Sequence, residues 1–350
     1  MENEKIAKLF LNAPIISIEG NNHGRIHDTF VVSYLDNNKE KKVLFQKVNK
    51  DVFNNINLLM NNIVSVTSFL ENKNIPTLHV KKTIDGSNYY KYNDCYYRCF
   101  EYVDNTISYD HPKDDEVIYE IGKAYGEFLN NLSDYPLSSF EGVLKDFHNT
   151  KKRFTNLTSS LELDSYKRKE FAKDEIEFIF SKEQCINLFF SLLENKMIPL
   201  HIIHGDTKAN NVILDKDTNK YKMVVDLDTI LKDTLLFDYG DGIRSIASTK
   251  EDTIDINIFK SFTNGFIDGA FSILTDVEIK NFVLSILVVT LELAIRYLTD
   301  YLSGDIYFKI ENDNDNLIRA RHQINFFMDV ENKKELLQEL VFSIYKKKKV

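Results

Sequence analysis

A polar octapeptide at residues 204–211 lies between two short apolar segments, and this spacing constrains the fold more than any other feature of the chain. The octapeptide carries Asp206, Lys208 and Asn211, and the second apolar segment ends at Asp226. Short apolar segments bounded by polar residues are typical of buried strands. The pattern therefore predicts two neighbouring strands with an Asp-Lys-Asn loop between them and a further acid nearby.

These four side chains match what the transfer of a phosphoryl group from ATP requires. We interpret Asp206 as the carboxylate that orients or deprotonates the attacking hydroxyl. Lys208 can offset charge on the transferring phosphate, although a lysine considered alone would usually be a solvated loop charge. Asn211 and Asp226 offer oxygen ligands for Mg²⁺. The spacing resembles the catalytic loop and metal-binding Asp of protein-kinase-like enzymes, so we predict a kinase that uses Mg²⁺ and ATP.

Charge and cysteine usage indicate which classes of partner and which cell compartment suit this chain. The chain has 350 residues and a formal net charge of −9, which argues against nucleic acid or an anionic membrane as the main partner. Cys95, Cys99 and Cys185 have neither a paired framework nor metal-ligand spacing, so we expect reduced thiols in a cytoplasmic protein. The apolar run at 282–291 is about half the length needed to cross a bilayer and predicts a buried core helix.

The first hundred residues predict a small mixed lobe. The expected order is strand, strand, strand, helix and further strands, at residues 11–19, 29–34, 43–48, 51–70, 78–83 and 89–102. From residue 115 onward the pattern is mostly helical. We predict an α+β, bilobal, protein-kinase-like fold. Its small N-terminal lobe, with an antiparallel sheet plus a helix, covers residues 1–103, and a larger, mainly helical lobe covers 104–350. The hinge is expected near residues 101–106, with the nucleotide between the lobes.

Local motifs outside the octapeptide are found at residues 24–30, 45–53, 97–109, 225–244 and 296–308. Together they resemble the N-acetylhexosamine 1-kinases, within the aminoglycoside phosphotransferase and choline kinase superfamily. The resemblance implies Mg-ATP-dependent phosphorylation of the anomeric hydroxyl of a small-molecule sugar. The alternatives are a kinase with another acceptor (aminoglycoside, choline, homoserine) and a non-catalytic pseudokinase. The intact Asp206, Asn211 and Asp226 argue against the pseudokinase.

The resemblance also implies where the nucleotide binds. Adenine is expected at the backbone of the hinge and the phosphates beneath a glycine-containing hairpin, which gives these positions: Gly20, Gly24, Lys47, Glu101 and Val103. Neighbouring residues of a strand face opposite sides, so only one of Gln46 and Lys47 can enter the cleft. The following helix offers no Glu as the usual partner of such a lysine.

The sugar-holding positions implied by the resemblance are Arg25, His27, Arg296 and Tyr307. An arginine in an otherwise apolar helix should face either a ligand or an acid, and Asp300 and Glu292 are candidate acids for Arg296.

Three acids and one glycine complete the expectations for the site. Asp228 is expected to bind a second ion, to hold Lys208 or another base, or to contact the substrate. We expect Asp238 and Asp241 to be helix N-caps. The N-acetylhexosamine 1-kinases usually carry His at the position of Arg25 and often Asn at that of Gly205. We expect the second departure to be silent and the first to affect the sugar site.

Overall fold

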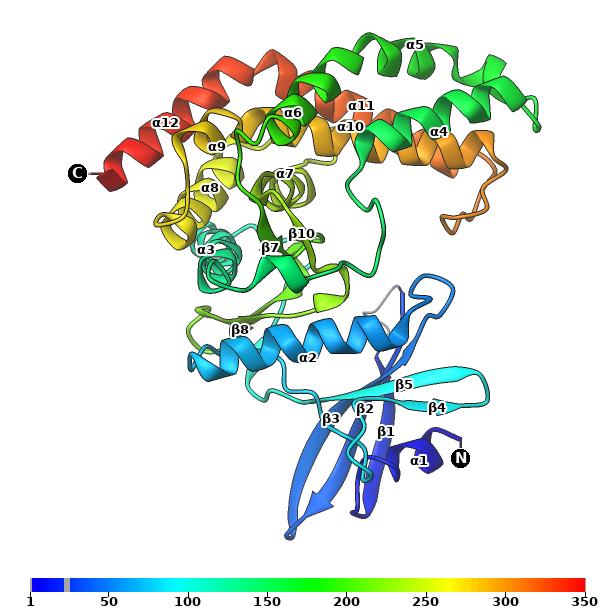
Figure 1. Ribbon diagram of the computed structural model, residues 1–350, viewed down its shortest axis with the longest axis vertical. Helices are drawn as coiled ribbons and strands as arrows, with labels where there is room; N and C mark the ends of the chain where they lie inside the picture. The colour runs from blue at the N-terminus through cyan, green and yellow to red at the C-terminus, as the bar shows by residue number, and fades with distance from the viewer. Residues whose placement is uncertain (1, 22–25, 350) are drawn as a thin grey trace.

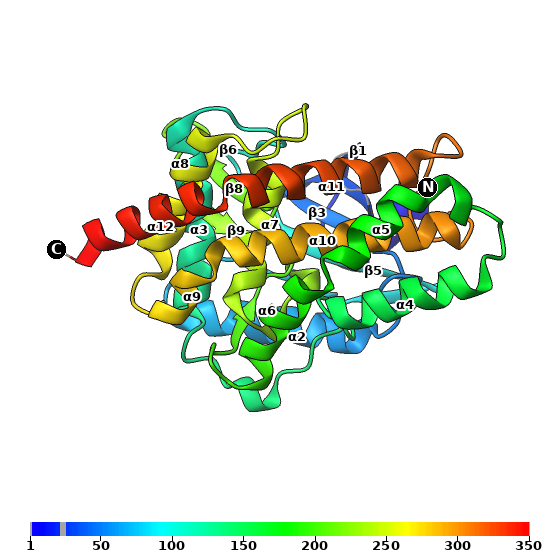
Figure 2. The same ribbon diagram turned by 90° about the horizontal axis from the view of Figure 1, so that it is seen from above.

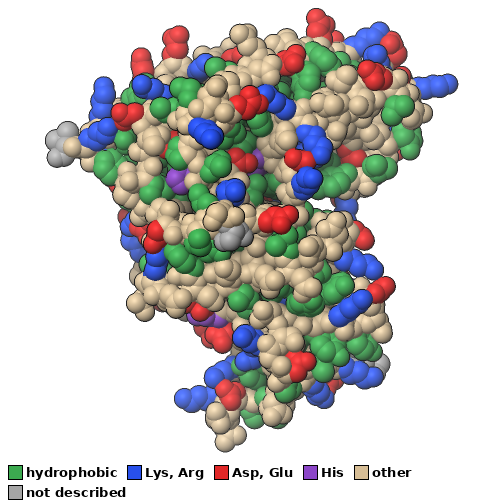
Figure 3. Space-filling model, in the orientation of Figure 1, with side chains coloured by type: hydrophobic (Ala, Val, Ile, Leu, Met, Phe, Trp, Pro, Cys, Tyr) green, Lys and Arg blue, Asp and Glu red, His purple; other side chains and the backbone are tan. Residues whose placement is uncertain are grey.

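The computed structural model describes residues 2–21 and 26–349 and has two lobes of different architecture (Figure 1). The smaller lobe is built on an antiparallel sheet, and the larger lobe is mainly helical. Both features confirm the predicted bilobal α+β fold. On one side the molecular surface is indented between the lobes (Figure 3).

A five-stranded antiparallel sheet, in the order β1-β2-β3-β5-β4, forms the smaller lobe. Its strands are β1 (Ile15–Asn21), β2 (Asp28–Asp36), β3 (Lys39–Val48), β4 (Tyr90–Tyr92) and β5 (Cys95–Glu101). Side chains alternate between the two faces of each strand. On the outer face, Phe45 and Tyr97 belong to a small apolar cluster with residues of α1 (Glu2–Ala7). On the inner face, Val48 and Phe100 join the core of the larger lobe.

Helix α2 (Ile56–Asn72) lies between the sheet and the larger lobe (Figure 1). It begins later than expected because Asn55 caps it: the Asn55 side chain accepts the backbone N–H of Leu58 at 3.0 Å. The apolar face predicted from helical spacing is confirmed, since every member is at most 5% exposed: Phe53, Ile56, Leu59, Met60, Ile63, Val66 and Leu70. This face joins α2 to the core of the larger lobe.

The prediction of a strand at residues 78–83 was wrong. Only an isolated bridge between Val80 and Phe100 forms there. Two backbone hydrogen bonds flank that bridge, from Lys81 to Cys99 and from Glu101 to His79, both 2.9 Å. The segment therefore hydrogen-bonds to residues 99–101 of β5, past the end of its pairing with β4, and does not become a further strand of the sheet.

The chain leaves the first sheet at Glu101 and enters the larger lobe through β6 (Thr106–Ile107), which pairs with β8. Two small sheets, β6-β8-β9 and β7-β10, contain the remaining strands: β7 (His201–Ile203), β8 (Val212–Asp215), β9 (Tyr221–Val224) and β10 (Leu231–Asp233). The helices of this lobe are α3 (Asp115–Asn131), α4 (Thr150–Leu163), α5 (Lys173–Ser181), α6 (Glu183–Glu194), α7 (Leu235–Ile246), α8 (Ile256–Ala270), α9 (Asp276–Lys280), α10 (Phe282–Leu302), α11 (Asp315–Asn332) and α12 (Lys334–Lys349).

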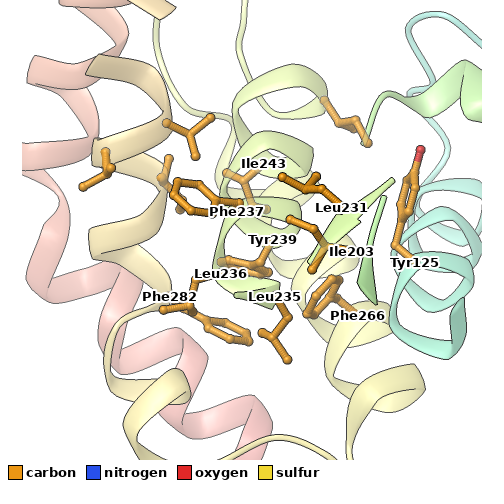
Figure 4. Packing of buried hydrophobic residues seen from close by; sticks show 14 of the residues in the cluster. Tyr125, Ile203, Leu231, Leu235, Leu236, Phe237, Tyr239, Ile243, Phe266 and Phe282 are labelled. Carbon is orange, nitrogen blue, oxygen red and sulfur yellow. The ribbon is translucent and has the colours of Figure 1, made fainter. Parts of the chain in front are cut away.

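The core of the larger lobe surrounds α7, whose apolar side chains meet those of α8 and α10 (Figure 4). Tyr239 of α7, for example, stacks on Phe282 of α10 with ring centroids 3.9 Å apart. Seen from above, α10 runs across the middle of the larger lobe, with α11 along one side of it and α4 along the other (Figure 2). α10 is long and apolar enough to span a membrane, but 78% of its most apolar window is buried inside the protein. The predicted core helix is thus confirmed.

Candidate active site

The predicted catalytic loop connects β7 to β8. The second predicted apolar segment is β9, which pairs with β8 in a different sheet from β7. Within the loop, Lys208 Nζ lies 2.5 Å from Asp206 Oδ2. Burial disfavours the charged form of Lys208, but the carboxylates of Asp206, Asp226 and Asp241 outweigh burial and raise the pKa of Lys208. The two residues predicted to be catalytic therefore form one ion pair, and Lys208 stays cationic.

Two buried aspartates of α7 hold the backbone of this loop. The Asp238 carboxylate accepts the backbone N–H groups of His204 and Gly205, each at 2.8 Å. Asp241 accepts the backbone N–H of Thr207 at 3.1 Å. Three N–H donors on either side of Asp206, at 204, 205 and 207, are thus fixed by carboxylates of one helix. These bonds set the position of Asp206 itself.

The expectation that Asp238 and Asp241 are helix N-caps was wrong, because Thr234 caps α7 and both aspartates lie inside the helix. Burial raises the pKa of Asp238, and His204 and the bonded N–H groups oppose this rise. For Asp241, Arg244 outweighs burial and lowers the pKa. A pair of carboxylates three residues apart in an apolar helix was the sequence signal for a buried role.

Gly205 is required by its conformation and its surroundings. Its φ of +80° lies in the left-handed region, and a Cβ atom there would lie 2.7 Å from the carbonyl oxygen of Thr229 and 2.8 Å from Leu231 Cδ2. A side chain at this position would therefore push the loop away from residues 229–231. The structure gives glycine a conformational reason at this position, and the expectation that the departure is silent for function stays a prediction.

Asn211 and Asp226 lie on either side of the same loop. Asn211 Nδ2 donates to the carbonyl oxygen of Asp206 at 2.9 Å, which directs the amide oxygen away from the loop backbone. Asp226 has left-handed dihedral angles of φ 60° and ψ 58°. Within residues 2–21 and 26–349, no donor hydrogen-bonds its carboxylate. Burial, followed by the charges of Asp228 and Asp206, raises the pKa of Asp226.

Asp228 does not contact Lys208. Its carboxylate receives a bidentate pair of hydrogen bonds from Arg98, at 2.6 and 2.8 Å, and lies 2.5 Å from His27 Nε2. Arg98 outweighs the effect of burial and, with His27, lowers the pKa of Asp228. The base that Asp228 holds is thus Arg98, a residue that sequence reasoning missed. The expected strand also ends before Asp228, at Val224, so Asp226 and Asp228 belong to a turn.

Lys47 lies on the wrong face of β3 to bind phosphate. It is paired with Tyr97, and Phe45, on the same face of β3, packs in the outer cluster next to α1. Gln46 points inward instead, where its Oε1 accepts a hydrogen bond from Arg98 Nε at 2.9 Å. The prediction of Lys47 as a phosphate ligand was therefore wrong. At this level of the sheet, the cation on the inner face is Arg98 of β5.

The other nucleotide positions lie along β1 and at the end of β5. Gly20 is within β1, opposite Phe30, with open space where a Cβ would stand. Gly24 lies outside the described residues. The backbone N–H of Glu101 is bonded to the carbonyl oxygen of His79 at 2.9 Å. Among the described residues, the N–H of Val103 has no partner, whereas its carbonyl oxygen accepts Thr106 Oγ1 at 2.8 Å.

The structure brings Arg296 and Tyr307 together, whereas His27 is engaged with Asp228. Arg25 lies outside the described residues. His27 has both ring nitrogens in use, Nε2 at Asp228 and Nδ1 as acceptor of the Asn49 backbone N–H at 3.0 Å. Arg296 lies over several aromatic rings at 5.5–6.0 Å, those of Phe147, Tyr307 and Phe308. Tyr307 is 64% exposed.

Arg296 has no salt bridge with either of its two candidate acids. Glu292 is hydrogen-bonded by Thr150 at 2.8 Å and paired with His148. Asp300 accepts the backbone N–H groups of residues 306–308, and so shapes the loop that carries Tyr307. Arg296 therefore keeps its guanidinium available beside the aromatic rings.

A second arginine, Arg153 of α4, lies near Arg296 and was not predicted. It donates to the carbonyl oxygen of Phe147 at 3.3 Å, but its buried Nε has no hydrogen-bond partner in the described part of the chain. Burial and then the charge of Arg296 lower the pKa of Arg153. The Phe147 ring lies 3.5 Å from the Cβ position of Gly205, so the residue that both arginines contact borders the catalytic loop.

Comparison with known proteins agrees with this architecture. The sequence pattern of the phosphotransferase enzyme family (APH) matches residues 57–266, more than half of the chain. An aminoglycoside phosphotransferase from Alicyclobacillus acidocaldarius subsp. acidocaldarius DSM 446 has a similar structure, with a TM-score of 0.61, 12% identity, and coverage of 95% of this chain and 96% of that chain. A choline kinase from Cryptosporidium parvum Iowa II has a TM-score of 0.59 and 16% identity, with coverage of 97% of this chain and 98% of that chain. A spectinomycin phosphotransferase solved with ADP and spectinomycin has a TM-score of 0.54 and 14% identity, with coverage of 98% of both chains.

Proposed function

Because this chain belongs to the phosphotransferase enzyme family, we propose that it transfers the γ-phosphoryl group of ATP to the anomeric (C1) hydroxyl of an N-acetylhexosamine. The observation that carries the proposal is the meeting of Asp206, Lys208, Asn211 and Asp226 around one loop. Phe147 lies beside this loop, and it contacts two arginines that form no salt bridge within the described residues. The family membership supports the phosphoryl transfer. The acceptor rests on the residues that border the loop.

Asp206 is the group that would orient the attacking hydroxyl. Transfer through a loose transition state needs positioning more than early proton removal, and the bonds from Asp238 and Asp241 supply that positioning. Lys208, 2.5 Å from Asp206, can turn its ammonium group to the transferring phosphate and offset the charge on its oxygens. If Lys208 turned from Asp206 to the phosphate, the Asp206 carboxylate would be free to bind the attacking hydroxyl.

The donor set fits Mg²⁺, which prefers oxygen ligands and retains several waters. The Asn211 amide oxygen is directed away from the loop, and the Asp226 carboxylate is without a hydrogen-bond donor in residues 2–21 and 26–349. A buried carboxylate beside two others is stabilised by a cation. Bound there, the metal would neutralise charge on the phosphates. No described cluster of three or more His, Cys, Asp or Glu residues could hold a metal, so phosphate oxygens and water would complete the coordination.

A nucleotide as co-substrate is supported by the similar solved structures that contain ADP or GDP. In this chain, the N–H of Val103 is a donor that adenine could use, since it is not bonded within the described residues. The choice of ATP over GTP remains part of the proposal, and assays with both nucleotides decide it.

The acceptor pocket we propose contains Arg296, Arg153, Phe147 and Tyr307. Guanidinium groups and a phenol donate directional hydrogen bonds to hydroxyl and acetamido oxygens, and the aromatic rings suit the apolar face of a sugar. Two cations near the loop disfavour acceptors that carry ammonium groups, such as aminoglycosides or aminoalcohols. Amine-bearing acceptors are therefore the rival outcome of the same assay.

The proposal is tested by measuring ADP release with N-acetylglucosamine, N-acetylgalactosamine, an aminoglycoside and choline, and by identifying the product by phosphorus NMR. A sugar 1-phosphate shows coupling between phosphorus and H1 and is labile to mild acid, whereas a 6-phosphate is not. We expect Arg296→Ala to raise the KM for the sugar far more than that for ATP. Inert N-acetylhexosamines, or a 6-phosphate product, would refute the acceptor assignment but not the family.

A further inference from the structure

Every side chain that hydrogen-bonds the Asp228 carboxylate in the described structure belongs to the smaller lobe, although Asp228 itself belongs to the larger one. Arg98 of β5 and His27, just before β2, supply the three contacts, at 2.6, 2.8 and 2.5 Å. All three side chains are almost completely buried, Asp228 at 3%, Arg98 at 2% and His27 at 8% exposure. We call these three residues the interlobe lock.

The smaller lobe holds both donors of the interlobe lock firmly. His27 Nδ1 accepts the backbone N–H of Asn49, so the ring proton is on Nε2 and is donated to Asp228. Arg98 Nε donates to Gln46 Oε1 at 2.9 Å, which fixes the guanidinium plane. Two segments of the smaller lobe therefore contact a single carboxylate, and Gln46 and Asn49 hold the two donors in place.

The interlobe lock is directly connected to the proposed metal site. Asp226 lies two residues before Asp228, in a tight left-handed turn followed by the 3₁₀ turn Leu227–Thr229. Because this connection is so short, a shift of the Asp228 carboxylate would be transmitted to the backbone turn that carries Asp226. On the inner face of the sheet, β3 offers Gln46 and no cation, since Lys47 faces outward.

We propose that Arg98 is a positioning residue that takes the place of the missing β3 lysine. It holds Asp228 against the smaller lobe, and so directs Asp226 toward the metal and the nucleotide only when the two lobes stand in the arrangement seen here. The free-energy cost of taking two charges out of water offsets most of the Coulomb attraction between them. The buried pair therefore adds little net stability and mainly defines geometry. The planar guanidinium binds both carboxylate oxygens, which an ammonium group cannot do in the same way.

This inference rests on the proposed Mg-ATP activity and predicts a defect in metal binding. Residues that orient metal ligands from behind typically contribute about 10- to 100-fold to metal affinity or activity. We therefore expect Arg98→Lys, which keeps the charge but loses the fork, to weaken Mn²⁺ binding in the presence of a non-hydrolysable ATP analogue about tenfold. Binding is measured from the electron paramagnetic resonance signal of free Mn²⁺, independently of turnover.

A second variant separates positioning from simple stability. Arg98→Met leaves Asp228 buried without its cation, and the fold can fail for that reason alone. Arg98→Met combined with Asp228→Asn removes that charge and keeps an acceptor for His27. We expect this double variant to unfold near the wild-type temperature and yet to bind Mn²⁺ at least about tenfold more weakly. The control is Arg321→Met, which removes a distant arginine–carboxylate pair with Glu175 (2.6 Å) and should bind Mn²⁺ normally.

The outcomes distinguish the two proposals. A wild-type protein that binds no Mn²⁺–nucleotide and transfers no phosphate overturns the proposed function. An active wild type whose Arg98→Lys and double variants bind Mn²⁺ with unchanged affinity overturns the inference alone, because the interlobe lock would then be only a structural contact. Weakened Mn²⁺ binding in both variants, with the control unaffected, supports it.

Discussion

Replacing Asp238 by Asn should damage the catalytic loop more than its distance from the reacting groups suggests. The Asp238 carboxylate accepts two backbone N–H groups at 2.8 Å in a fully buried position. Hydrogen bonds to a charged group contribute about 1.5–3 kcal/mol each. The Asn amide can replace one acceptor but turns an NH₂ group toward the second N–H. We therefore expect the free energy of unfolding to fall by about 2–4 kcal/mol.

Turnover should fall as well, because the bonded N–H groups belong to His204 and Gly205, immediately before Asp206. A displacement of about 1 Å at a reacting group reduces rate by about 10²-fold, so we expect kcat to fall 10- to 100-fold. The KM for ATP should change little, since Asp238 is placed to act on the loop alone. Urea unfolding and a coupled ADP-release assay measure the two effects.

Asp255→Asn is the matched control. Asp255 also accepts two backbone N–H groups, of Asn257 and Ile258 at 2.9 and 3.1 Å, but it caps α8 far from the loop in sequence. Because Asn is as good an N-cap as Asp, this change should alter stability by well under about 1 kcal/mol and leave kcat unaltered. If Asp238→Asn behaves like Asp255→Asn in both assays, the loop is positioned by other contacts and our reasoning fails.

Three further predictions concern single residues. Asp226→Asn should fold normally but lower kcat by at least about 10³-fold, and near-normal turnover would contradict its role as metal ligand. Lys47→Met should leave the KM for ATP within about twofold, since the side chain is on the outer face; a large rise in KM would restore Lys47 to the nucleotide site. Burial raises the pKa of Asp233 from 3.8 to about 6. The neutral form therefore adds stability below about pH 4 that is lost as the pH rises through 6, at most about 3 kcal/mol. Asp233→Asn should remove that fall in a pH series of urea unfolding, and an unchanged series would exclude Asp233 as its source.

The sequence predicted local features well because they depend on residues close together in the chain. The apolar face of α2 follows from helical spacing: six of the seven predicted members lie in α2, Phe53 precedes the helix, and all seven are buried. Asp206 and Lys208, two residues apart, could be expected to share a site, and they form an ion pair. The buried α10 was also predicted from its apolar run, and 78% of its most apolar window is buried inside the protein.

Contacts that join distant segments were not predictable in the same way. Asp228 is 130 positions from Arg98 and 201 from His27, so no local pattern indicated that these residues meet. The face on which Lys47 lies depends on which side of the sheet covers the cleft, and a strand pattern alone does not specify that. The role of Asp238 and Asp241 likewise depended on α7 packing beneath the catalytic loop.

The sequence by itself therefore determined the chemistry that is available: a carboxylate, a cation, an amide and a second carboxylate at spacings that a loop and a following strand can bring together. Only the tertiary structure decided which groups hold that chemistry in place. Buried carboxylates must find donors and buried cations must find acceptors, wherever in the chain these lie. That requirement is met by the packing of the two lobes, through Arg98 and Asp228 between them and through Asp238 and Asp241 beneath the loop.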